Sequence, residues 1–585
     1  MRRTSVISRL KTLVLAMLAC VLLALIAPLF LVTRAVDEPF SGYSVLASPR
    51  DLHVIAKPVR LSVAPDLTLS RGVLYADGNA ALGTPISRFV LDGPVFYLNA
   101  SGLAATGGFD SDVVAPEAAV AAPLLEQFMS MGFDALTIRR GTLYIMTADG
   151  AAETIADIQA EVMGTRKGHV SGKGSFAVRG QRLTFETNLL PPADKSAAQL
   201  WLSKLTLKGA LIDATFEGSI DVAADLKVQG YAELSAASLR RIIRWFGSPV
   251  PIAEGLNAVS LKGQLSWARG TVMVEKAKVT VDGSEAAGAL GFTYTGEHPA
   301  IDATLAFNTL DLSPYFEALR SQSYVFDRHT WTWSAFDFTF PMLASFDADL
   351  RLSAASLAFK GVPLGRSAAS IAVRSGKLIA NIVELELPMG TASGRLTADV
   401  SESPPRYALR AKIDNFEPAP AATWLTGLPI LSGRSVLKLD LKTAGQTPTE
   451  ALKGLAGKVG LSLVESGKLG LDLRAIRAGT QTAADPGQLV RGSTNIDALE
   501  ARANLVDGLL VAEHVQAKSA GHSISASGSA NLLDHTLDLR LLVQPVPGER
   551  AGLPPDAAGG AGLILNGPWA LPSVRREAAG DATAR

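Results

Sequence analysis

Apolar and polar residues alternate with a period of two over long stretches of the chain. In 437–442, leucines occupy the odd positions and Lys438, Asp440 and Lys442 the even ones. In 406–413, Tyr407, Leu409, Ala411 and Ile413 likewise alternate with charged or small residues. Successive side chains of a β-strand point to opposite faces, so each segment has one apolar and one polar face. The pattern predicts antiparallel strands that are wet on one side.

Glycine-containing turn signals separate these stretches. Glycine tolerates positive φ, which tight hairpin turns require, so these positions predict hairpin tips. Together with loosely repeated glycine spacings, they predict a β-meander that recurs along the chain. The signals are Asp-Gly at 77–78, 92–93, 149–150, 282–283 and 507–508, and Ser-Gly-Lys-Leu at 375–378 and 466–469.

Residues 12–32 form an uncharged apolar run of 21 residues. As a helix this run spans ~30 Å, the thickness of a bilayer core. Arg2, Arg3, Arg9 and Lys11 precede it and predict a cytoplasmic N-terminus by the positive-inside rule. A cleaved signal peptide is the alternative, but its apolar region is shorter and ends at a small-residue site. The sequence therefore favours an uncleaved single-pass anchor, with the rest of the chain outside the cytoplasm.

Helical segments are few and short. The expected helices are 238–246, 313–319, 118–131 and 420–425. The fold class predicted is mainly β: one N-terminal transmembrane helix, then repeated antiparallel β-meanders that form an elongated, rolled sheet or groove with a few short helices. The tail after Gly548 is rich in Ala, Gly and Pro, which predicts disorder apart from a strand near 561–567.

Composition narrows the functional classes. Lys+Arg and Asp+Glu both number 55, so there is no basic excess to neutralise phosphates, which argues against nucleic-acid binding. Cys20 is the only cysteine, so neither an internal disulfide nor a thiolate zinc site can form. Apolar residues make up 48% of the chain, and much apolar surface has to be covered by protein, membrane or ligand.

No motif of enzyme chemistry emerges. The sequence has no Walker loop, no G-x-S-x-G elbow and no H-E-x-x-H helix. Glu384 and Glu386 could form a carboxylate pair, although an exposed polar face explains them equally well. His514, His522 and His535 lack ligand spacing. The sequence predicts no enzyme, no catalytic residue, no metal site and no cofactor.

One stretch has a recognisable order of elements: LKGLAGKVGLSLVESGKLGLDLRAI at 452–476. It resembles the signature of AsmA-type proteins, in which a Leu-x-Gly strand, an apolar strand, a turn and G-x-D-L follow one another. Residues 427–452, 310–316, 537–548 and 565–577 resemble other positions of that family. The resemblance implies a bacterial inner-membrane protein that projects into the periplasm and serves outer-membrane biogenesis. Its longer relatives resemble bridge-like proteins that carry phospholipid.

The resemblance and the anchor divide the chain into five segments. We expect a basic cytoplasmic N-terminus (1–11), the transmembrane helix (12–32), an N-terminal periplasmic β-repeat region (33–299), an AsmA-like C-terminal β region (300–548), and a strand with a disordered tail (549–585).

The leading functional hypothesis is phospholipid binding or transfer through an apolar β groove. Its partners would be the inner membrane, envelope lipid and, where contacts are made, outer-membrane or periplasmic assembly proteins. An assembly or scaffold factor without lipid is the alternative. A second sheet could also cover the apolar faces and leave no room for acyl chains. The candidate groove residues are Leu437, Leu439, Leu441, Leu461, Leu463, Tyr407, Leu409 and Ile413.

Overall fold

The computed structural model is mainly β and divides into two units, Met1–Ala306 (unit 1) and Phe307–Arg585 (unit 2). The division falls inside one strand, and the finer boundaries expected from the sequence stay predictions. The structure describes residues 44–47, 52–55, 59–60, 67–77, 88–99, 135–146, 152–165, 169–191, 200–221, 227–245, 255–293, 298–315, 326–327, 332–333, 340–359, 362–426, 430–471, 492–546, 561–569 and 572–577.

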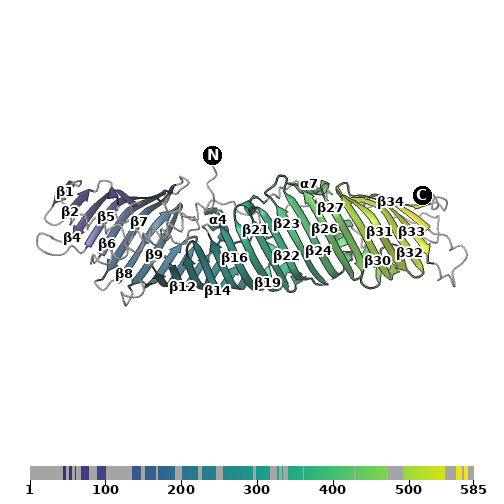
Figure 1. Cartoon of the computed structure of the whole chain (residues 1–585), viewed down its shortest axis with the longest axis horizontal. Helices are drawn as coiled ribbons and strands as arrows, with labels where there is room; N and C mark the ends of the chain where they lie inside the picture. The colour runs from purple at the N-terminus through teal and green to yellow at the C-terminus, as the bar shows by residue number, and fades with distance from the viewer. Residues whose placement is uncertain are drawn as a thin grey trace. The chain divides into compact units, whose positions relative to one another are not determined.

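Unit 1 is a sheet in which β2 and β3 both pair with β4, and from β4 onward the strands follow one another in chain order (Figure 1). Its strands are β1 (Ser44–Ala47), β2 (Leu52–Ile55), β3 (Val59–Arg60), β4 (Leu67–Asp77), β5 (Arg88–Asn99), β6 (Ala135–Met146), β7 (Ala152–Gly164), β8 (Val170–Val178), β9 (Gln181–Leu190), β10 (Leu200–Gly209), β11 (Asp213–Asp221), β12 (Lys227–Ala236), β13 (Val259–Ala268), β14 (Thr271–Val281), β15 (Ser284–Thr293) and the first part of β16 (Ala300–Asp311).

Among the described strands of unit 1, one pairing departs from the predicted antiparallel arrangement. Strands β5 and β6 run parallel, with Phe89 opposite Leu136 and Phe96 opposite Leu143. A parallel pair needs a crossover connection of a dozen or more residues, and residues 100–134 provide that length. The period-two pattern fixes which residues share a face but not the direction of the neighbouring strand.

Unit 2 contains a second series of strands in chain order, and every pairing described in it is antiparallel (Figure 1). Its elements are β17 (Phe326–Asp327), β18 (Thr332–Trp333), the 3-10 helix η2 (Pro341–Ala344), β19 (Asp347–Phe359), β20 (Val362–Leu364), β21 (Ser367–Arg374), β22 (Lys377–Glu386), β23 (Thr391–Asp399), β24 (Arg406–Phe416), α6 (Pro418–Thr426), β25 (Leu431–Ser432), β26 (Ser435–Ala444), α7 (Pro448–Lys453), β27 (Ala456–Leu463), β28 (Gly467–Leu469), β29 (Thr494–Ile496), β30 (Ala498–Val506), β31 (Leu509–Ser519), β32 (His522–Asn531), β33 (Thr536–Pro545), β34 (Ala561–Pro568) and β35 (Ser573–Glu577).

Two-residue turns connect many of these strands as expected. At 282–283, 375–376 and 507–508 both central residues have positive φ, between 48° and 83°. That geometry matches the right-handed twist of the flanking strands. Two predicted tips are different: Gly93 lies inside β5, where the register with β4 is irregular, and Gly467 lies inside β28. A glycine that permits positive φ serves a bulge or a close strand contact as readily as a turn.

The helices are short, as predicted. Helix α4 (Leu239–Trp245) and α6 confirm two expected segments, and the described part of a third begins at Ser313. The segment expected at 118–131 lies outside the described residues. Helix α7 was not predicted, although its N-cap signal is present. Thr447 Oγ1 accepts a hydrogen bond from Glu450 N. The Glu450 carboxylate in turn accepts one from Gln446 N, one residue before the N-cap, which is a variant of the capping box.

The predicted membrane segment, 12–32, and the four preceding cations lie outside the described residues. Within the part of the chain that the structure describes, no helix has both the length and the apolarity to span a bilayer.

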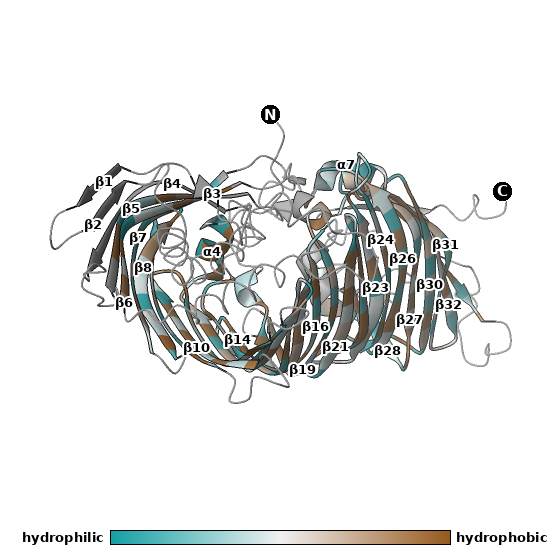
Figure 2. Cartoon of the chain, turned by 60° about the vertical axis from the view of Figure 1, so that its left-hand side comes forward, coloured by the Kyte–Doolittle hydropathy of each residue, from teal (hydrophilic) through white to brown (hydrophobic). Residues whose placement is uncertain are grey.

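Fully buried side chains of unit 1 gather on one face of β6–β9. Strand β9 alternates between buried and exposed positions: Leu183 and Phe185 are buried, whereas Thr184 and Glu186 are exposed. The ring of Phe185 lies 6.2 Å from that of Phe176. Figure 2 shows α4 on the concave side of the unit 1 sheet. The C-terminal carbonyl of α4, on Trp245, accepts a hydrogen bond from Arg179, whose guanidinium also pairs with Glu153.

Candidate functional site: the apolar face of the unit 2 sheet

The strand register brings the predicted groove residues together on one face of unit 2. Ile413 lies opposite Leu437, and Leu437 lies opposite Leu461. Directly opposite residues of antiparallel strands share a face, so this row crosses β24, β26 and β27 without changing sides. A second row joins Leu409 to Leu441. We call the following set the apolar face: Leu350, Ile371, Ile382, Leu396, Tyr407, Leu409, Ile413, Leu437, Leu439, Leu441, Leu461 and Leu463.

The opposite side of the same strands is charged and wet. Arg410 lies opposite Asp440, and its Nε is 3.2 Å from the Asp440 carboxylate, with both side chains more than half exposed. Lys412 and Asp414 form a similar pair at 2.8 Å. Exposed pairs of this kind contribute little stability, about 0–1 kcal/mol, so they keep this side soluble rather than hold the sheet together. Figure 2 shows the resulting alternation of polar and apolar positions along the strands.

The apolar face is only partly covered. All eight predicted groove residues are half-buried, and none is fully buried. Two large side chains of this face, Leu396 and Ile382, are 41% and 39% exposed. In unit 1, Leu143 and Leu183, on the buried face of β6 and β9, are at most 1% exposed. The β6–β9 part of unit 1 is therefore covered more completely than the apolar face of unit 2, whereas most apolar positions of β11 and β12 are half-buried.

At the C-terminal end of unit 2 the same face is dry. The short strands β25, β28 and β29 form a three-stranded sheet whose Leu431 and Ile496 pack in one cluster with Ile524, Val543 and Leu563 of the main sheet. Of the predicted groove residues, Leu461 and Leu463 pack against this cluster. The structure thus separates these two residues from the other six, which lie in the more open part of the face.

Close backbone approach also shapes this face. Gly457 lies opposite Leu441, has φ of +146°, and a Cβ there would lie 2.0 Å from the backbone oxygen of Asp440. No side chain fits such a contact unless the two strands move apart.

We expect Gly457→Ala to lower the free energy of unfolding of unit 2 by more than about 1 kcal/mol, because the new Cβ is strained by both the backbone angle and the contact. Gly460→Ala, in the same strand, is the matched control: its Cβ would meet only Lys438 Cβ at 3.8 Å. Hydrogen exchange of peptides from β26 and β27 measures the difference, and equal protection in the two variants would contradict this account.

The two carboxylates that could suggest acid–base chemistry, Glu384 and Glu386, lie in different surroundings. The Glu386 carboxylate accepts hydrogen bonds from the backbone N–H of Arg366 at 2.9 Å and from its guanidinium. These bonds hold the pKa of Glu386 below its usual value. A general acid at neutral pH needs the opposite shift. Glu384 is exposed nearby and takes no part in these bonds.

The three histidines occupy different elements: His514 lies in β31, His522 begins β32, and His535 lies in a turn. The Nδ1 atom of His522 lies 3.0 Å from the backbone oxygen of Ala520. His535 is in the turn that precedes β33. Among the described residues, no group of three His, Cys, Asp or Glu side chains could hold a metal ion.

His535 gives unit 2 a testable pH dependence. Its ring is buried and lies edge-on to Trp569 at 5.4 Å, and burial lowers its pKa. The folded chain therefore favours the neutral ring, while the unfolded chain binds a proton below about pH 6.5. We expect the stability that this residue contributes to be complete above that pH and to be lost as the pH falls below it.

Thermal unfolding of the full chain at pH 7 and pH 5 checks this expectation against His535→Asn, which tolerates the positive φ of 53° at this turn. The variant should lose less stability between the two pH values than the natural chain. An identical loss of stability in the natural chain and in the variant would contradict the role given to His535.

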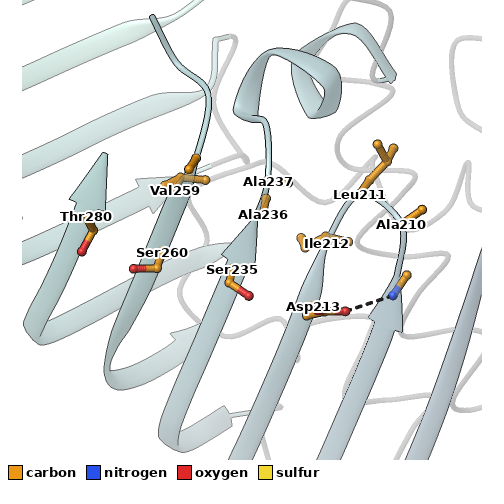
Figure 3. Close-up of a pocket in the computed structure, with 12 residues that line it drawn as sticks. Ala210, Leu211, Ile212, Asp213, Ser235, Ala236, Ala237, Val259, Ser260 and Thr280 are labelled. Carbon is orange, nitrogen blue, oxygen red and sulfur yellow. Dashed lines mark hydrogen bonds between the residues drawn. The ribbon is translucent and has the colours of Figure 1, made fainter. Parts of the chain in front are cut away.

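A small cleft in unit 1 was not anticipated from the sequence. It has a volume of about 340 Å³ and lies where strands β10–β14 end beneath α4 (Figure 3). Asp213, Ser235, Ser260 and Thr280 lie in register across four strands and supply its polar side. Leu211 and Val259 supply apolar walls. Strand ends that are distant in the sequence form it, so no local motif marks it.

Comparison with known proteins adds no identification. No protein-family model, no curated protein and no solved structure matches this chain. The AsmA-type resemblance therefore stays a prediction from the sequence, and the function has to be argued from the geometry of the apolar face.

Proposed function

We propose that this chain is a membrane-anchored envelope protein that binds or transfers phospholipid along the apolar face of unit 2. The observation that carries the proposal is the exposure of this face: large apolar side chains continue in register from β19 to β27, and Leu396 and Ile382 remain more than a third exposed. A contiguous apolar surface that is exposed to water marks a binding site.

Acyl chains are suitable occupants on energetic grounds. Covering apolar surface gains about 25 cal/mol per Å², and each buried methylene gains about 0.8 kcal/mol relative to water. A bilayer offers the same gain, so exchange between membrane and protein is nearly balanced. The charged side of the strands, with pairs such as Arg410–Asp440, faces water and leaves only the apolar side for the chains.

The sequence supports the remaining parts of the proposal. The apolar run at 12–32 and its preceding cations predict an inner-membrane anchor with the β units in the periplasm. The AsmA-type resemblance favours a role in outer-membrane biogenesis. In this proposal the apolar face of unit 2 serves as the predicted groove, and elongation or rolling of the sheet belongs to the proposal as well.

Native mass spectrometry of the full chain, extracted in a mild detergent, tests the proposal. We expect phospholipid adducts that persist after the detergent is stripped, and lipid extraction identifies their headgroups. A chain that is lipid-free under these conditions but co-purifies with an envelope protein would favour the scaffold alternative instead.

A further inference from the structure

The three-stranded sheet β25–β28–β29 is made from the ends of strands that belong to the main sheet. Strand β25 directly precedes β26, β28 directly follows β27, and β29 directly precedes β30. The main-sheet order is β26–β27–β30, and the small sheet repeats it as β25–β28–β29. Three adjacent strands therefore bend together, and we call their bent ends the cap.

The bend is built into specific residues. Gly433 has φ of +122°, and a Cβ on it would lie 2.9 Å from Gly467 Cα, so glycine is needed where β25 and β28 approach. The Glu417 carboxylate accepts hydrogen bonds from Gly433 N at 2.9 and 3.0 Å. An ion pair between Arg434 and Glu465 joins the two strands at the same bend.

The cap is fastened to the strand next to it. Asp497 N donates to Lys518 O at 2.7 Å, and Ser519 Oγ donates to Asn495 O at 2.6 Å. Ile496 is fully buried between these bonds. These contacts hold β29 of the cap against the end of β31.

The cap covers the continuation of the apolar face. Leu431 and Ile496 pack with Ala517, Ile524 and Val543 of β31–β33, and with Leu563 and Leu565 of β34, all at most 7% exposed. Upstream, at β22 and β23, the same face reaches about 40% exposure at Ile382 and Leu396. In the same upstream part, Val373 and Ala398, which lie in one row with Tyr407, are buried. The face is thus partly open upstream and closed downstream by the protein's own strands.

We propose that the cap sets the C-terminal boundary of the binding face, so that acyl chains bind between β21 and β26 and are excluded from β31–β34. The inference rests on the proposed function, because it assigns the extent of the same site. This boundary implies that lipid leaves the face along the strand direction or at its β21 end, unless the cap opens.

A phospholipid with a diazirine in its acyl chain tests this on the unmodified full chain. After irradiation, mass spectrometry of peptides maps the adducts. We expect adducts in 367–444 and at least about tenfold fewer in 509–545 and 561–568, since a tenfold difference needs only about 1.4 kcal/mol of preference.

The cap is then opened with Ile496→Asp, which places a charge in the dry cluster. Adducts in 509–545 should rise severalfold, while those in 367–444 stay unchanged and show that the upstream face is intact. Asn495→Asp is the matched control, because it adds the same charge at the exposed neighbouring position. If Ile496→Asp also loses the upstream adducts, Ile496→Ala gives a milder opening.

The outcomes separate the two proposals. Adducts at both ends of the face in the natural chain would overturn the boundary but keep lipid binding. Upstream adducts alone, with no gain after either cap substitution, would overturn the cap as the excluding element. No adducts in any strand would overturn the proposed function and the boundary with it.

Discussion

Replacing Leu409 with Asp is expected to lower the phospholipid bound per chain at least about tenfold. Leu409 lies between Leu396 and Leu441 in register, near the middle of the open part of the apolar face. A carboxylate there would lose its hydration against acyl chains, at a cost of several kcal/mol, and about 1.4 kcal/mol already corresponds to a factor of ten. Phosphorus analysis of the purified full chain, with native mass spectrometry, measures the loss.

Ala408→Asp is the control for Leu409→Asp. Ala408 is the preceding residue of β24 and points to the exposed polar side, so the same charge remains in water. This variant should retain the lipid. If both variants retain it, phospholipid is bound elsewhere on the chain and the assignment of this face is wrong.

The largest loss of stability is expected from Phe185→Ala in unit 1. Phe185 is 5% exposed and packs against Phe176 in the dry face of β6–β9. Truncating a buried phenylalanine costs about 3–5 kcal/mol, which combines lost burial with a cavity that the sheet cannot close. Pulse proteolysis or hydrogen exchange of peptides from β7–β10 reports the change in unit 1 alone.

Glu186→Ala, at the next position of β9, should change stability by no more than about 0.5 kcal/mol, because its side chain is exposed. Leu409→Ala, on the partly covered face of unit 2, should cost clearly less than Phe185→Ala. A loss as large as that of Phe185→Ala would indicate that the face of unit 2 is as dry as that of unit 1.

The strands could be predicted because their signal is local. Alternation in 406–413 and 437–442 assigns each side chain to a face, and the two-residue turns at 375–376 and 507–508 fix where the chain reverses. The same signals placed the six open groove candidates on one face. Whether lipid occupies that face stays a prediction, because alternation describes the strand and not what covers it.

Features that depend on distant residues could not be predicted. The parallel pairing of β5 with β6 leaves no trace in the period of either strand. The cap arises because three short strands that are far apart in sequence converge on β31–β34. They carry Leu431, Leu469 and Ile496. Leu461 and Leu463 show the consequence: their alternation is the same as that of Leu437 and Leu439, yet they pack against the covered cluster.

Nearly every strand pairs with its neighbour along the chain through a short turn, so most backbone hydrogen bonds join segments close in sequence. Closing such short loops costs little entropy, and folding rate rises as contacts become more local. A chain of 585 residues built this way can add strands one after another from any folded hairpin, as repeat proteins do. The slow steps should then be joins across long connections, such as the β5–β6 crossover, the pairing of β27 with β30 and the docking of the cap.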